Sequence, residues 1–167
     1  APALPLPRPA GDSVRLVHLT DIHLAPLPRF AWQHWNIKRA LGYGNWSRKR
    51  QLIHMRAALD EIVAHAMAQQ GDHTLVGGDL INIGLPLEYG AALGWLLELG
   101  PPDRVAVVPG NHDIYTRLLT DPGHGRWQAF MTGDRAWRPA QVEASLTDGP
   151  MFPFVRTIGR VAIIGVN

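Results

Sequence analysis

Three short apolar segments, each followed by a cluster of glycine, histidine and acidic residues, constrain the fold of this chain most strongly. Segments 14–19, 74–76 and 105–108 are rich in valine and leucine, which is typical of strands buried in a sheet. Between them, apolar spacing and the placement of proline and glycine predict helices over 47–70 and 86–99. Because strands and helices alternate, the sequence favours a layered α/β fold with a largely parallel core.

The rest of the chain is less regular. Residues 25–46 show no clean period, and a helical stretch is expected near 125–131. Segments 152–158 and 160–166 look like two adjacent strands that turn near Gly159.

The first thirteen residues differ in composition from the remainder of the chain. Prolines at positions 2, 5, 7 and 9 favour an extended, polyproline-like arm over residues 1–13. The predicted domain therefore covers 14–167. Its 46% hydrophobic and 18% charged residues are sufficient for an ordinary core. No apolar run approaches the roughly 20 residues needed to cross a bilayer.

Two features of composition exclude whole classes of chemistry. The chain has no cysteine, which rules out disulfides, thiolate metal sites and a cysteine nucleophile. The net charge of +2 disfavours a nucleic-acid-binding protein.

The polar clusters Asp21-x-His23, Gly78-Asp79 and Gly110-Asn111-His112-Asp113 each follow one of the predicted strands. Loops at the carboxyl ends of parallel strands lie side by side, so these clusters are expected to converge. Carboxylate, amide and imidazole ligands suit Mn, Fe, Zn or Co. Alone, Asp21-x-His23 is better explained as a surface or packed histidine and Gly78-Asp79 as a turn, whereas the Gly-Asn-His-Asp tetrapeptide is a stronger signal; all three in this order predict a metal site.

The segments LTDIHL, VGGDLIN and VPGNHD resemble the first three sequence blocks of the calcineurin-like metallophosphoesterase superfamily. The chain is most similar to the bacterial branch that includes class III cyclic-nucleotide phosphodiesterases, over roughly residues 14–167. The resemblance implies an αββα sandwich and two divalent metal ions, with Mn, Fe or Zn as the candidates.

Metal ligands follow from the resemblance position by position. Asp21 and His23 would hold the first ion. Asp79 would bridge both ions, and Asn111 would bind the second.

The resemblance also implies two catalytic residues. His112 would face the scissile phosphate as general acid or as a donor to the leaving oxygen, and Asp113 would orient its ring. A water activated between the two ions would be the nucleophile, which agrees with the missing cysteine.

Later family blocks, a lone histidine and then Gly-His-x-His, are not found. The only histidine after Asp113 is His124, interpreted here as a loop residue. We therefore expect the N-terminal part of a longer enzyme, with its second sheet incomplete because the chain stops at Asn167. Another copy or a missing C-terminal part would cover the exposed sheet.

Segment 29–56 is basic and contains Trp32, Trp35 and Trp46. The basic residues fit either an anion-handling rim or a solvated helix face, and the tryptophans fit a small local core better than base stacking.

The sequence thus predicts a metal-dependent phosphohydrolase, specifically a phosphodiesterase acting on a small-molecule phosphoester. The alternative is a non-catalytic metal-binding or interaction module with a partial site. The absence of a signal segment favours the cytoplasm of a bacterium.

Overall fold

A computed structural model of the chain describes residues 13–28, 37–45, 56–114, 121–137 and 152–167. The expected arm at 1–13 lies outside these residues except for Ser13, as do the three tryptophans of segment 29–56.

The centre of the fold is a parallel sheet of three strands, β1 (Leu16–Leu19), β2 (His73–Val76) and β3 (Val105–Val107). The strand order is β1-β2-β3, with Leu16 opposite His73 and Thr74 opposite Val105. The predicted α/β class and parallel core are confirmed. Strand β2 begins one residue before the predicted segment 74–76, at His73, which is buried.

Among the described residues, three α-helices lie between the strands of this sheet: α1 (Ile37–Asn45), α3 (Arg56–Ala68) and α4 (Pro86–Leu99). The bounds of α4 agree with the prediction, because proline suits the first turn and Gly100 ends the helix at φ 151°. The segment containing α1 has no clean apolar period, so this helix was not predicted. Its buried Arg39 donates a hydrogen bond from Nη2 to the carbonyl oxygen of Gly84 at 2.7 Å.

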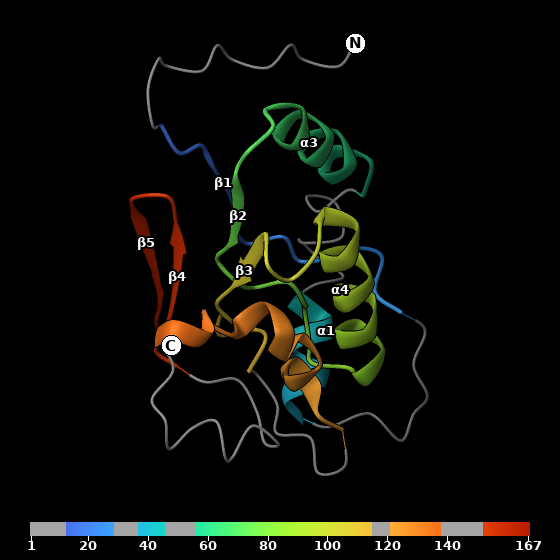
Figure 1. Cartoon of the computed structure of the whole chain (residues 1–167). Coiled ribbons are helices and arrows are strands. Elements are labelled where there is room, and N and C mark those ends of the chain that lie inside the picture. Colours follow the sequence, from blue (N-terminus) through green and yellow to red (C-terminus); the bar gives the residue numbers. More distant parts are fainter. Residues whose placement is uncertain (1–12, 29–36, 46–55, 115–120, 138–151) are drawn as a thin grey trace.

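Two 3₁₀ helices and a hairpin complete the described fold. The 3₁₀ helices are η3 (Gly123–Met131) and η4 (Arg135–Trp137), so His124 lies in a helix rather than in a loop. Strands β4 (Phe154–Ile158) and β5 (Val161–Gly165) pair antiparallel, as predicted, and turn at Gly159 with φ 57°. In Figure 1, α4 and this hairpin lie on opposite sides of the parallel sheet.

The core fills the space between the parallel sheet, α4 and η3. Its largest fully buried side chains include Trp127, Tyr89 and Phe130. Trp127 and Tyr89 pack with ring centroids 5.7 Å apart, and the indole nitrogen of Trp127 donates to the Tyr89 carbonyl at 3.1 Å. This packing fixes α4 and η3 beside the sheet.

Arg156 of β4 ties the hairpin to the rest of the fold. Its guanidinium is buried and donates to five main-chain carbonyl oxygens, those of Pro102, Val105, Ala129, Phe130 and Thr132. One side chain thus joins the start of β3, the end of η3 and the second sheet. Burial lowers the pKa of Arg156, although Asp134 and Asp103 oppose this shift.

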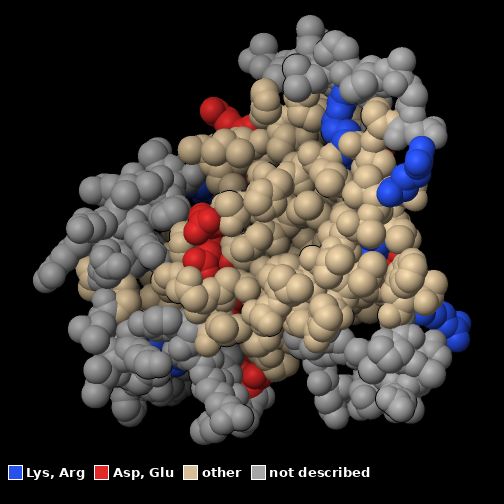
Figure 2. Space-filling view, turned by 90° about the vertical axis from the view of Figure 1, so that its left-hand side faces the viewer, with Lys and Arg blue, Asp and Glu red and all other residues tan. Residues whose placement is uncertain are grey.

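The outer side of the hairpin carries few charges. Figure 2 looks onto this side, and few charged side chains lie at its centre. Ile164 lies in β5 and is 63% exposed, and Val166 follows the strand and is 64% exposed. No described helix combines the length and the apolar character needed to cross a membrane.

Candidate metal centre

The loops after the three parallel strands continue side by side beyond the sheet. The amides of His23 and Leu24 donate to the carbonyls of Asp79 and Leu80 at 2.8 and 2.9 Å. The amide of Asp21 donates to Gly78 at 3.2 Å. The main chain therefore fixes the first two polar clusters relative to each other.

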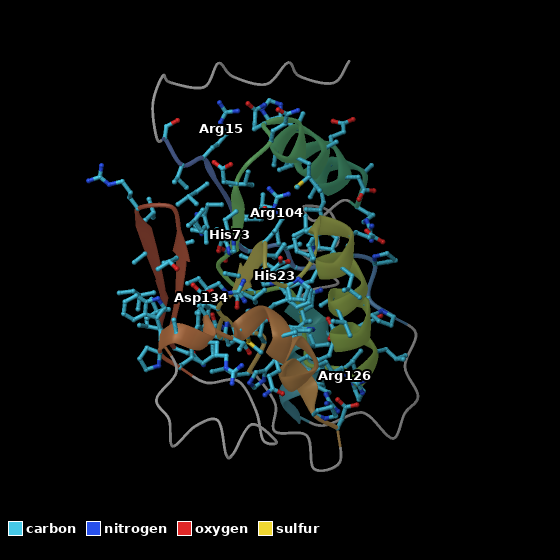
Figure 3. All side chains as sticks on the ribbon, viewed as in Figure 1. Arg15, His23, His73, Arg104, Arg126 and Asp134 are labelled. Atoms are coloured by element: carbon cyan, nitrogen blue, oxygen red, sulfur yellow. The ribbon has the colours of Figure 1, made fainter. Side chains whose placement is uncertain are left out.

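His23, Asp79 and His112 meet at this edge of the sheet. Their ligand atoms all lie within 4.8 Å of one another, and the two imidazole rings meet edge to face with centroids 4.8 Å apart. Figure 3 shows His23 beyond the ends of the strands, at the opposite end of β1 from Arg15. Each of the three polar clusters thus contributes one residue to this group, so the clusters converge as predicted.

Both imidazole rings are held through Nδ1. That atom of His23 lies 3.0 Å from the Ile81 carbonyl oxygen, and that of His112 lies 2.7 Å from the Asn82 carbonyl oxygen. A carbonyl oxygen only accepts, so Nδ1 carries the proton and the lone pair of each neutral ring is at Nε2. Backbone carbonyls in this role are typical partners of histidines that bind metals. The donor set therefore fits a divalent transition metal.

The backbone around the cluster is strained. Asp21, His23 and Asp79 have φ of 55°, 44° and 53°, and only Gln70 joins them among the described non-glycine residues with positive φ. Such conformations cost on the order of 1–3 kcal/mol each and concentrate at functional sites. Three such conformations in the two adjacent loops that follow β1 and β2 support a functional role for this edge of the sheet.

Two glycines allow the second and third clusters to approach each other. A β-carbon on Gly78, which has φ 86°, would lie 2.2 Å from the nitrogen of Gly110. A β-carbon on Gly110 would lie 2.2 Å from Oδ1 of Asp79. The same Oδ1 accepts the amide hydrogen of His112 at 2.9 Å. Asp79 can therefore occupy this position only because residue 110 is glycine, which has no side chain.

Asp113 organises the loops rather than the ring of His112. Its fully buried carboxylate accepts four main-chain hydrogen bonds at 2.8–3.2 Å, from the amides of Asp79, Leu80, Ile81 and Gly110. Our expectation that Asp113 orients the His112 ring was wrong, because the Asn82 carbonyl holds Nδ1. Burial raises the pKa of Asp113 to about 6, although the amide donors oppose this shift, so the carboxylate is ionised above that pH.

Asp113→Asn should lower the free energy of unfolding by about 3 kcal/mol at pH 7.5. The amide nitrogen would face main-chain donors, leaving buried N–H groups without an acceptor. Urea denaturation followed by circular dichroism measures this. The control is Asp103→Asn, at an exposed aspartate, with an expected change within about 0.5 kcal/mol. Equal stability of the two variants would refute the structural role of Asp113.

Glu88, which the sequence analysis did not identify, supports the same region. Its buried carboxylate accepts the amides of Asn82, Ile83 and Leu85 at 2.7, 3.2 and 2.9 Å. Burial raises its pKa, and the hydrogen bonds oppose that shift. An acidic residue two positions after a helix-initiating proline was the available signal. Through Asn82, Glu88 fixes the carbonyl that holds His112.

The other two predicted ligands lie at the same edge but are exposed. Asp21 accepts a hydrogen bond from Thr20 Oγ1 at 2.8 Å, and its carboxylate lies outside the 4.8 Å cluster. Asn111 is exposed immediately before His112.

Comparison with known proteins decides the family. A sequence model of the calcineurin-like phosphoesterases matches residues 14–157. The chain belongs to the calcineurin-like phosphoesterase family. No curated protein and no solved structure matches this phosphoesterase significantly.

Family membership gives the general class of chemistry. Calcineurin-like phosphoesterases hydrolyse phosphoesters with the help of divalent metal ions. In this phosphoesterase, the cluster of His23, Asp79 and His112 is consistent with that requirement.

Proposed function

We propose that the chain hydrolyses phosphodiesters of small molecules with two divalent metal ions held at the candidate centre. The observation that carries this proposal is the convergence of His23, Asp79 and His112 within 4.8 Å in a family of phosphoesterases. Asp21 and Asn111 would join His23 and Asp79 as the metal ligands, and His112 would act on the substrate.

Metal ions bound there would polarise the phosphoryl oxygens and lower the pKa of a water molecule. Asp79 and His23 would hold them, one through a carboxylate and one through Nε2. Asn111, next to His112, would add an amide oxygen, and Asp21 a second carboxylate.

His112 would act on the leaving oxygen. Its Nδ1 donates to the Asn82 carbonyl at 2.7 Å, so in the neutral ring Nε2 carries the lone pair and would exchange a proton with the substrate. Asp113 would not touch the substrate. It would contribute by fixing the loops that carry Asp79 and Gly110. We propose Asp113 as a positioning residue.

Metal removal tests this function. The purified protein, dialysed against trace Mn²⁺ and Zn²⁺, should contain close to two ions per chain by elemental analysis. It should release p-nitrophenolate from bis(p-nitrophenyl) phosphate. Dialysis against EDTA should abolish the release, and Mn²⁺ should restore it. One ion or fewer, with no release, would favour the alternative of a non-catalytic metal-binding module.

We also propose that the catalytic domain covers 14–167, preceded by the arm at 1–13, and belongs to the bacterial phosphodiesterase branch. Its proposed compartment is the bacterial cytoplasm. A second copy or a C-terminal part is the proposed cover for the exposed side chains of the hairpin.

A further inference from the structure

A cavity of about 320 Å³ opens directly beside the candidate metal centre. It lies between the end of β1 with its following loop and the first half of α3. Asp21 and His23 form part of its wall. A phosphorus atom at the centre would therefore place one of its substituents in this cavity.

The wall formed by α3 is apolar. Ala58, Leu59 and Ile62 line the cavity from one face of the helix, since residues three and four apart share a face. Leu59 is partly buried against the core, but Ile62 is 57% exposed. Apolar side chains that line a cavity next to a few polar groups are a typical feature of a ligand site.

The opposite wall mixes apolar and polar side chains, and it includes Asp21 and His23 of the candidate centre. It contains Leu19, Ile22 and Ala25, together with the more polar His18 and Thr20. We name the cavity between these residues and the apolar face of α3 the ester pocket.

Arg56 is the cation among the described lining residues, and its charge is already balanced. Its Nε lies 2.7 Å from Asp60 Oδ1, and its Nη2 lies 3.7 Å from Glu98 Oε2. Two carboxylates next to the guanidinium weaken its attraction for a further anion. The described wall therefore suits an uncharged group better than a second phosphate.

We propose that the ester pocket binds an uncharged, apolar ester group of the substrate, of aryl size, and that Ile62 determines this preference. This rests on the proposed function, because it assigns the phosphorus to the neighbouring centre. The expected substrates are phosphodiesters that carry one aryl or comparably apolar group.

Two substrates with the same leaving group test the pocket. Phenyl p-nitrophenyl phosphate and methyl p-nitrophenyl phosphate differ only in the group expected in the ester pocket. With the Mn²⁺-loaded protein, kcat/KM should be about tenfold higher for the phenyl ester, since an apolar ring is transferred from water. In Ile62→Gln this ratio should fall to about two, because an amide replaces part of the apolar wall.

Leu97→Gln is the matched control. Leu97 lies on α4, outside the ester pocket, and is also 57% exposed, so this variant loses an equally exposed apolar side chain elsewhere. It should keep the wild-type ratio. Hydrolysis of both esters without preference would overturn the ester pocket and leave the proposed function standing.

Binding provides a readout that does not depend on turnover. By calorimetry in the presence of Mn²⁺, phenylphosphonate should bind about tenfold more tightly than methylphosphonate, and Ile62→Gln should remove the difference. This preference without any hydrolysis would support the ester pocket and refute the proposed function. Equal affinities, or no binding of either phosphonate, would overturn the ester pocket.

Discussion

Asp79→Asn is expected to reduce phosphodiester hydrolysis by about a thousandfold or more and to remove at least one metal ion per chain. The carboxylate is the acidic member of the described cluster, and in the proposed centre its negative charge would help to hold both cations. Hydrolysis of bis(p-nitrophenyl) phosphate and elemental analysis of the same preparation measure both effects.

The asparagine variant should stay folded, which makes the result interpretable. Asp79 has φ 53°, a conformation that asparagine adopts as readily as aspartate. Asparagine also retains an oxygen that can accept the His112 amide hydrogen. The free energy of unfolding should therefore change by no more than about 1 kcal/mol. A variant that keeps its activity and both ions would refute the two-metal assignment.

Gly110→Ala is expected to cause a large loss of activity without removing any polar group. The added β-carbon would lie 2.2 Å from Asp79 Oδ1 and 2.7 Å from the Asp79 nitrogen. These contacts are too short to persist, so Asp79 must move and leave the cluster. We expect at least about a hundredfold loss of kcat/KM, since displacement of a catalytic group by about 1 Å costs that much.

Gly94→Ala is the control for this steric argument. Gly94 lies in α4, and an added β-carbon there meets nothing within 4 Å. Alanine is the better helix former by about 1 kcal/mol, so this variant should be slightly more stable and fully active. Comparison of kcat/KM and unfolding curves for the two variants separates displacement of Asp79 from a general effect of alanine. Wild-type activity of Gly110→Ala would contradict the close approach.

The convergence of the three clusters could be predicted because it depends on topology alone. Parallel neighbouring strands bring their carboxyl ends to one edge, so His23, Asp79 and His112 had to lie near one another once the strands were identified. The helix α4 could be predicted for a local reason, because proline and glycine mark its two ends.

The finer arrangement could not be predicted, because it depends on main-chain atoms distant in the sequence. Nothing in the sequence pairs the His112 ring with the Asn82 carbonyl, 30 positions earlier. The four amides that surround Asp113 likewise come from two loops whose relative position is set only in the folded chain. Helix α1 was missed because Gly42 and Gly44 interrupt its apolar pattern.

The anchoring of both imidazoles on carbonyl oxygens has a consequence for how this centre tolerates mutation. The acceptors belong to the peptide groups of Ile81 and Asn82, and every amino acid carries the same carbonyl. A point mutation at either position changes what packs around the loop, yet it cannot delete the acceptor. The choice of Nδ1 as the protonated nitrogen of each neutral ring therefore depends on the path of the main chain and not on the side chains at 81 and 82. Neighbouring side chains are free to diversify, and with them the choice of substrate, while the chemistry stays the same.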